Sequence, residues 1–398
     1  MSKQKKFIFA LFYLAPFVDA ANGYLIFNNF LPEGSLFSPS QILRFCITAF
    51  SFTLLNLKDF YKIVGLGLFF LIIEFISFNL HFNPKGFILG AVYSYKIIYF
   101  LLVFYSLKNI VSDFGIMKLI QLYIKSAVIY SVILWASTLI GISKSTYITG
   151  TFGSKGLFAS GNGLSIFLGT SALIAYYYYQ SFPKRNNLIY FILISISTIL
   201  VGTKASIIFI FFILILFFYN ASFKRKLVYI FVHFIVGLFY LKNIVSFFST
   251  IFDVILYRYK SSSTFISFIA SNRDNYIIDA FNHYNIDGFN LIRVFFGSGI
   301  FISFRNFSDS NLIYDTLESD LFDLFFAYGI LGTIFYLGFI YLGFINILKK
   351  FNLTLFLAWL IIVSYSIIAG HVIFNAMSSI ALISLFLIIS LRNKHNVL

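Results

Sequence analysis

Three acidic residues lie close together in the segment TLESDLFDLFFAYGILGTIFYL, where a polar stretch gives way to a long apolar one. Asp320 and Asp323 are three residues apart and would share one face of a helix, whereas Glu318 would point elsewhere. A carboxylate at a half-buried position can take a proton from a hydroxyl group, which makes Glu318 a candidate general base. The alternative for all three is that they are acids at the start of a helix, where they offset its dipole.

Seven basic residues could together form an anion-binding surface. They are Arg44, Lys204, Arg258, Lys260, Arg273, Arg293 and Arg305. An arginine can hold a phosphate group through two parallel hydrogen bonds, whereas a lysine acts as a point charge. Each of these residues taken singly could also be a solvated or snorkelling charge. The set as a whole favours an anion site.

Lys96 and His371 also call for an explanation, because polar side chains in apolar segments are costly. Lys96 lies in the middle of GAVYSYKIIYFLLVFYSL, and His371 follows an apolar run in IIAGHVIFN. An ion pair of Lys96 with Glu74 or with Asp19 is one interpretation. Binding of an anionic lipid headgroup by Lys96 is the other.

The sequence lacks the usual motifs of metal and nucleotide chemistry. No pair of its five histidines has metal-ligand spacing, and neither G-x-x-x-x-G-K-[ST] nor G-x-S-x-G occurs. The glycine-rich stretch GSKGLFASGNG at 153–163 does not follow a predicted strand, so we do not interpret it as a nucleotide loop. We expect no metal and no cofactor.

The composition is that of an integral membrane protein. Of 398 residues, 60% are hydrophobic, 21% aromatic and only 11% charged, and the mean hydropathy is +0.91. So few charged residues cannot cover the surface of a soluble protein of this size. A single cysteine, Cys46, excludes a disulfide within the chain.

Apolar runs bounded by polar clusters predict an all-α polytopic protein with twelve membrane-spanning helices. The expected spans are 7–27, 40–57, 60–79, 86–107, 119–141, 161–180, 188–202, 205–220, 227–247, 321–346, 353–370 and 376–391. The segment 188–220 is long for one span and short for two, and we place a break at Gly202, Thr203 and Lys204. The first apolar run is too long for a signal peptide and is interpreted as a retained span.

The distribution of basic residues orients this topology. With the N-terminus in the cytoplasm, the cytoplasmic loops collect most Lys and Arg, and the short outer connections hold only Lys85, Lys144 and Lys155. Both termini are then cytoplasmic. The net charge of +15 follows from this bias, so we do not infer a nucleic-acid partner.

One connection is much longer than the rest. The predicted organisation is spans one to nine in residues 1–247, a large outer loop in 248–320, and spans ten to twelve in 321–398. Amphipathic stretches such as NYIIDAFNHYNIDGFNLIRVFF predict short helices against the membrane face in this loop. Arg44 and Lys204 fall on the same outer side as the loop and its cations.

Several separated stretches resemble, in order along the chain, the Wzy-type O-antigen and capsular polysaccharide polymerases, a family related to the O-antigen ligases. The stretches are PFVDAANGYL, FSPSQILRF, ITGTFGSKGLFASGNGLSIFL, LVGTKAS, VFFGSGI, ESDLFDLFFAYGILGTIFYL and AGHVIF. Together they cover most of the chain.

This resemblance implies a bacterial inner-membrane glycosyltransferase that uses undecaprenyl-diphosphate-linked oligosaccharides as donor and acceptor, without nucleotide sugar or metal. It implies that repeat units are joined on the outer face of the membrane. The partners are then the two lipid-linked substrates and the bilayer, with a chain-length regulator as a further partner to consider.

The resemblance also implies roles for the residues singled out above. Basic residues would bind the diphosphate, with Arg273 and Arg293 acting on the leaving group. The further substrate-binding candidates are Arg44, Lys96, Lys204, Arg258, Arg305, Asp320 and His371. Glu318 would be the acceptor base, at a place where ligases and many polymerases have histidine. Lys204 stands where arginine is common.

Two other functions fit a chain of this kind. An O-antigen ligase would share the resemblance, and a lipid-linked oligosaccharide flippase would share the span number and the basic residues. A flippase would be expected to show inverted or parallel repeats, with charges through both halves of a central cavity. The sequence shows no internal repeat, which favours the polymerase.

Overall fold

The computed structural model describes a predominantly helical chain. The described residues are 2–32, 34–81, 84–146, 153–220, 256, 259–260, 262, 264–286, 291–300, 316–368 and 370–392. Within them the strands β1 (Lys144–Ser145) and β2 (Ser154–Gly156) form a small antiparallel sheet in which Lys144 pairs with Gly156. All other regular structure in these residues is helical.

Helices occupy eleven of the twelve segments predicted as spans, and the segment 227–247 lies outside the described residues. They are α1 (Lys3–Ile8) with η1 (Phe9–Leu14) and α2 (Ala15–Phe27), α3 (Pro39–Phe52), α4 (Leu57–His81), α5 (Pro84–Phe114), α6 (Ile116–Leu139), α7 (Gly161–Ser181), α8 (Arg185–Val201), α9 (Lys204–Asn220), α14 (Asp320–Lys349), α15 (Leu353–Ile368) and α16 (Ala376–Arg392). Three shorter helices, α11 (Phe265–Ala270), α12 (Arg273–Ile286) and α13 (Leu291–Phe296), lie in the segment predicted as the large loop.

The chain is an all-α membrane protein. Among the described residues, five helical segments are long and apolar enough to cross a membrane: Lys3–Phe27, Leu57–Ser77, Gly86–Phe114, Ile116–Leu139 and Asp320–Lys349. Helices α8, α9, α15 and α16 are apolar but shorter. Large apolar side chains such as Phe211 and Leu214 of α9 are more than half exposed, which suits a surface that faces lipid.

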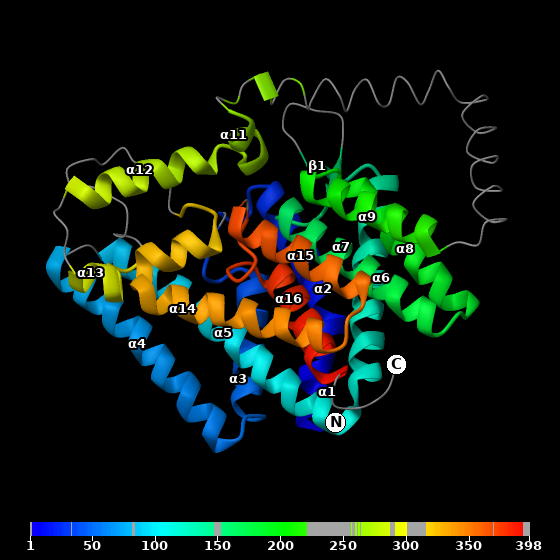
Figure 1. The fold of residues 1–398 in the computed structure, drawn as a ribbon, viewed down its shortest axis with the longest axis horizontal. Coiled ribbons are helices and arrows are strands. Elements are labelled where there is room, and N and C mark those ends of the chain that lie inside the picture. Colours follow the sequence, from blue (N-terminus) through cyan, green and yellow to red (C-terminus); the bar gives the residue numbers. More distant parts are fainter. Residues whose placement is uncertain are drawn as a thin grey trace.

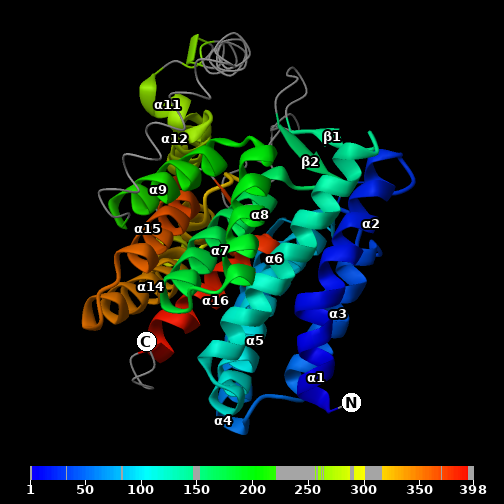
Figure 2. The ribbon, with the colours of Figure 1, turned by 90° about the vertical axis from the view of Figure 1, so that its right-hand side faces the viewer.

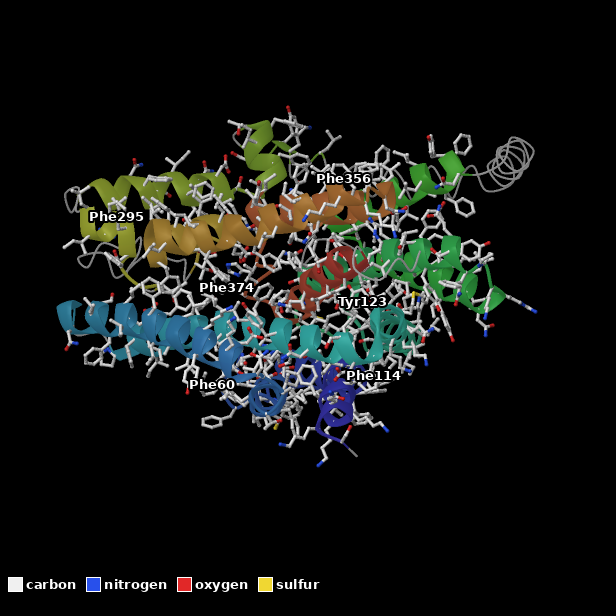
Figure 3. All side chains as sticks on the ribbon, turned by 60° about the horizontal axis from the view of Figure 1, so that its bottom comes forward. Phe60, Phe114, Tyr123, Phe295, Phe356 and Phe374 are labelled. Carbon is white, nitrogen blue, oxygen red and sulfur yellow. The ribbon has the colours of Figure 1, made fainter. Side chains whose placement is uncertain are left out.

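Helices α7 and α16 form the centre of the bundle. Every residue of α7 from 163 to 177 is buried, and so is every residue of α16 from 377 to 389. Helix α7 packs against α6, α8, α9, α15 and α16 (Figure 2). Aromatic side chains fill the interior, as for Tyr123 on α6, whose ring meets Phe167 of α7 edge-on at 5.1 Å between centroids (Figure 3). Neither buried stretch contains a charged residue, as expected of helices in a central position.

Two connections predicted on the outer side lie at one end of the bundle. The β1–β2 hairpin and helices α11 and α12 lie at the end opposite the N-terminus, as the blue start of the chain shows in Figures 1 and 2. The predicted break between α8 and α9 lies at this end as well. Gly202 ends α8 in the left-handed conformation, at φ +70°, and Thr203 Oγ1 accepts a hydrogen bond from the Ser206 amide at 3.1 Å. The break therefore places Lys204 at the first residue of α9.

Replacing Gly297 with alanine is expected to destabilise the protein. Gly297 belongs to VFFGSGI, one of the stretches that carry the family resemblance. Its φ is +81°, and a Cβ there would lie 2.0 Å from the carbonyl oxygen of Ala327 in α14. Left-handed strain and overpacking together should cost about 2–4 kcal/mol. The apparent Tm of the purified protein in detergent should fall. Gly338→Ala in α14 is the control, since no atom lies within 4 Å of the position that its Cβ would take. An equal Tm for the two variants would contradict the close packing of Gly297 against α14.

Candidate functional site

A cavity of about 610 Å³ opens among the polar segments at this end of the bundle. Its walls come from the β2–α7 loop, the start of α9, the α11–α12 junction and the second half of α15. The cationic lining residues are Lys155, Lys204 and Arg273. The polar ones are Thr146, Ser160, Asn162, Ser271, Ser364 and Tyr365. Segments far apart in the sequence thus bring three basic side chains to one cavity.

Lys204 is held at the cavity by the α11–α12 junction. Its Nζ donates hydrogen bonds to the carbonyl oxygen of Phe268 and to Ser271 Oγ, the latter at 3.1 Å, and lies 4.4 Å from the centroid of the Phe268 ring. These contacts orient the ammonium group at the cavity wall. The sequence-predicted binding residue Lys204 does line a cavity.

Lys155 belongs to strand β2 and enters the same cavity from the other side. Its Nζ donates to the carbonyl oxygen of Ala159 at 3.2 Å and lies 4.7 Å from the centroid of the Phe27 ring. The loop after β2 is fixed against α2, because a Cβ on Gly23 would lie 1.9 Å from the carbonyl oxygen of Leu157. Close packing between α2 and this loop therefore sets the position of Lys155.

Arg273 begins α12 and connects the cavity to Glu318. Its Nη1 donates to the carbonyl oxygen of Ala270 at 3.2 Å, and its Nη2 forms an ion pair with Glu318 Oε2. The Arg273 side chain is 11% exposed and the Glu318 side chain 50% exposed. Two residues that sequence analysis singled out separately, 45 positions apart, are thus in direct contact.

Glu318 has an unusual backbone conformation. Its φ is +57°, in the left-handed region that residues with a Cβ rarely adopt. It lies one residue before Ser319, the N-cap of α14. The start of α14 therefore presents Glu318 to Arg273 at the cost of local backbone strain.

The two aspartates of this segment are engaged with protein groups. Asp323 Oδ1 accepts the Leu317 amide at 2.8 Å, and its Oδ2 accepts the Ser319 amide at 3.2 Å. Oδ2 also contacts His371 Nε2 at 2.8 Å. Binding of backbone amides near the first turn agrees with the interpretation of Asp323 as an acid at a helix start.

Asp320 is fully buried and accepts hydrogen bonds from protein groups. Its Oδ2 accepts the amides of Val372 at 2.8 Å and Ile373 at 3.1 Å together with the Ser366 hydroxyl, and the residue has no exposed surface. Asp320 thereby joins α14 to the segment after α15, a contact that sequence spacing does not reveal. Substrate binding by Asp320 stays a prediction.

No family model, curated protein or solved structure matches the chain. Three cations around one cavity can bind a multiply charged anion, and a carboxylate next to one of them can accept a proton. Among the described residues, no three His, Cys, Asp or Glu side chains come close enough to hold a metal ion.

Lys96 makes neither of the ion pairs considered for it. Glu74 Oε1 accepts the Tyr328 hydroxyl at 3.1 Å and the Ile300 amide at 3.0 Å, while Asp19 accepts the hydroxyls of Ser40 and Tyr130, each at 2.7 Å. Lys96 Nζ lies instead over the Tyr93 ring, 3.9 Å from its centroid. Cation–π contact offsets part of the cost of this charge.

Of the predicted cations that the structure describes, Arg44, Lys96, Lys260 and Arg293 are not among the residues that line the cavity. The charge of Arg44 on α3 interacts with that of Lys96 on α5, and Lys96 also interacts with Asp323, which places Lys96 near the start of α14. Arg293 lies on α13. Arg258 and Arg305 lie outside the described residues.

Lys155 was missed as a site residue. We counted it only among the few basic residues of the outer connections. It lies in the glycine-rich stretch GSKGLFASGNG, which we did not interpret as a nucleotide loop and assigned no role. The same stretch supplies Ser160 and Asn162 to the cavity. The many glycine and small polar residues around this one lysine were the sequence feature that could have indicated a binding loop.

Proposed function

We propose that the protein is a polysaccharide polymerase of the Wzy type, a membrane glycosyltransferase that joins polyprenyl-diphosphate-linked oligosaccharide repeat units. The observation that supports this proposal best is the mixed character of the cavity. Lys155, Lys204 and Arg273 line it together with apolar residues of two membrane helices. An amphiphile with an anionic headgroup matches both kinds of surface.

The apolar part of the cavity comes from helices that a membrane would surround. These residues are Ala205, Ile208 and Phe212 of α9 and Leu360, Ile361 and Ile368 of α15. A lipid-linked donor must approach sideways from the bilayer, because its isoprenoid chain stays in the hydrocarbon region. Its diphosphate would then lie at the level of the membrane interface, beside the three cations.

The reaction needs little beyond charge stabilisation and one proton acceptor. A hydroxyl of the acceptor sugar attacks the anomeric carbon of the donor, the bond from that carbon to the diphosphate oxygen breaks, and the hydroxyl proton passes to a base. Lys155, Lys204 and Arg273 would stabilise the departing diphosphate. Glu318 is the proposed base, since it is half exposed and contacts Arg273 at the cavity wall.

This function requires a defined orientation in the membrane. We propose twelve spans with both termini in the cytoplasm of a bacterial cell, and an outer face that carries the cavity and the loop 248–320. Reporter fusions after residues 110, 184 and 350 should then report the cytoplasm, and a fusion near residue 285 should report the outside. A cytoplasmic signal near 285 would place the cavity on the wrong face for this substrate.

A deletion strain separates the polymerase from its alternatives. Loss of a polymerase leaves single repeat units attached where wild-type cells show a ladder of polysaccharide on a gel. Loss of a ligase leaves none attached and accumulates lipid-linked polymer, and loss of a flippase traps single units on the inner leaflet. Only the first pattern, restored by the gene on a plasmid, supports the proposal.

A further inference from the structure

Asp323 holds the backbone on both sides of Glu318. The Leu317 and Ser319 amides, which donate to its two carboxylate oxygens at 2.8 Å and 3.2 Å, belong to the residues immediately before and after Glu318. In return, the Asp323 amide donates to the Ser319 carbonyl oxygen at 2.8 Å. Asp323 is 2% exposed, so water does not compete for these bonds. A single buried carboxylate thus fixes both peptide groups next to the proposed base.

This arrangement explains how Glu318 keeps its left-handed conformation. A residue with a Cβ at φ +57° relaxes to another region unless its surroundings prevent it. In this conformation the Glu318 side chain contacts Arg273 Nη2. The two amide bonds to Asp323 supply that constraint.

His371 completes the arrangement from a different part of the chain. His371 Nε2 lies 2.8 Å from Asp323 Oδ2, and in the tautomer that carries the proton on Nε2 it donates a hydrogen bond to this carboxylate. The segment around His371 is itself fixed, because Asp320 binds the amides of Val372 and Ile373. His371 therefore reaches Asp323 from a rigid support.

We propose that Asp323 is a positioning residue for Glu318, and that His371 serves as the hydrogen-bond donor that holds Asp323. The inference rests on the proposed function, because it takes Glu318 as the base. It assigns His371 no direct contact with the reacting sugars. Without the Asp323 carboxylate, Glu318 would leave the left-handed conformation and its contact with Arg273.

The first test compares two variants of His371 in the purified full-length protein supplied with lipid-linked repeat units. In His371→Gln, the side-chain amide nitrogen can take the place of Nε2 as a donor to Asp323, whereas His371→Ala removes the donor. We expect kcat of His371→Gln to stay within about fivefold of wild type and kcat of His371→Ala to fall at least about tenfold, with the KM for the donor little changed. Equal loss in both variants would overturn the proposal, since it would show that the imidazole itself is required.

The second test reads the position of residue 318 without measuring activity. Arg273→Cys and Glu318→Cys are combined in a Cys46→Ser background and treated with a short bifunctional thiol reagent, and the cross-linked product is quantified by mass spectrometry. Adding Asp323→Asn should lower the yield several-fold, because residue 318 is no longer held toward residue 273. An unchanged yield would overturn the proposal. If Asp323→Asn does not give folded protein, His371→Ala takes its place, with His371→Gln as the matched control and the same criterion.

The two tests separate this inference from the proposed function. A lower cross-linking yield, together with a Glu318→Gln variant that polymerises normally, would support the positioning by Asp323 and reject Glu318 as the base. A normal yield with an inactive Glu318→Gln variant would reject the positioning and support the base.

Discussion

Glu318→Gln is expected to lower the initial rate of polymer formation by at least about a hundredfold. Glutamine keeps the size and polarity of the side chain but cannot accept the proton of an acceptor hydroxyl, and general-base catalysis typically contributes about 10²–10⁴-fold. Binding of the lipid-linked donor should change little, because Arg273 and the two lysines of the cavity remain. The measurement is the initial rate with purified protein and lipid-linked repeat units, alongside a direct binding assay for the donor.

Asp113→Asn is the matched control for this variant. Asp113 is an exposed carboxylate at the C-terminal end of α5, where it accepts a hydrogen bond from Gln4 at 2.8 Å. The initial rate of polymer formation by Asp113→Asn should therefore equal that of wild type. The prediction is wrong if Glu318→Gln polymerises within a few-fold of wild type. In that case the base lies elsewhere, and Glu318 is only an acid before a helix start.

The helices could be predicted from sequence because their signal is long and redundant. Each apolar run extends over many residues, so an error at one position does not hide the element. Even the difficult division of 188–220 was correct, since Gly202 allows a left-handed turn that ends α8 and Thr203 caps the next helix. Hydropathy also predicts the helical class without any knowledge of tertiary contacts.

The composition of the site could be predicted only in part. Lys204, Arg273 and Glu318 were singled out by charge in an otherwise apolar chain, and the structure brings the first two to one cavity and the third to Arg273. Sequence could not separate Arg273 from Arg293, because only the packing of α12 and α13 decides which of them reaches the cavity. Lys155 was missed because its place depends on the contact of its loop with α2.

Buried polar residues were the hardest to interpret. For Lys96 the sequence suggested a carboxylate partner, but Glu74 and Asp19 are bound to hydroxyl and amide donors, and an aromatic ring contacts the lysine instead. Asp320 and Asp323 were correctly placed at a helix start. Their partners in the segment 366–373 could not be foreseen, since no local pattern indicates contact between residues about fifty positions apart.

Glu318 and the diphosphate of the proposed reaction would compete for the guanidinium group of Arg273. In the structure its Nη2 is paired with Glu318, and the proposed reaction requires the same guanidinium to bind a diphosphate. A diphosphate carries more charge than one carboxylate, so its arrival would draw Arg273 away from Glu318 and release the carboxylate to accept a proton. Donor binding and activation of the base would then be coupled through one side chain.

Arg273→Ala is therefore expected to abolish polymer formation while the amount of protein in the membrane is retained. The variant loses a cation next to the leaving group, which is typically worth about 10²–10³-fold in rate, and it leaves Glu318 without its partner. Arg273→Lys should restore only part of the activity, because an ammonium group lacks the two parallel donors of a guanidinium. Arg185→Ala, at an exposed arginine at the start of α8, should give the ladder of wild-type cells on the same gel. A wild-type ladder from Arg273→Ala would show that Arg273 only balances the charge of Glu318, and the diphosphate would then have to be bound by the two lysines of the cavity alone.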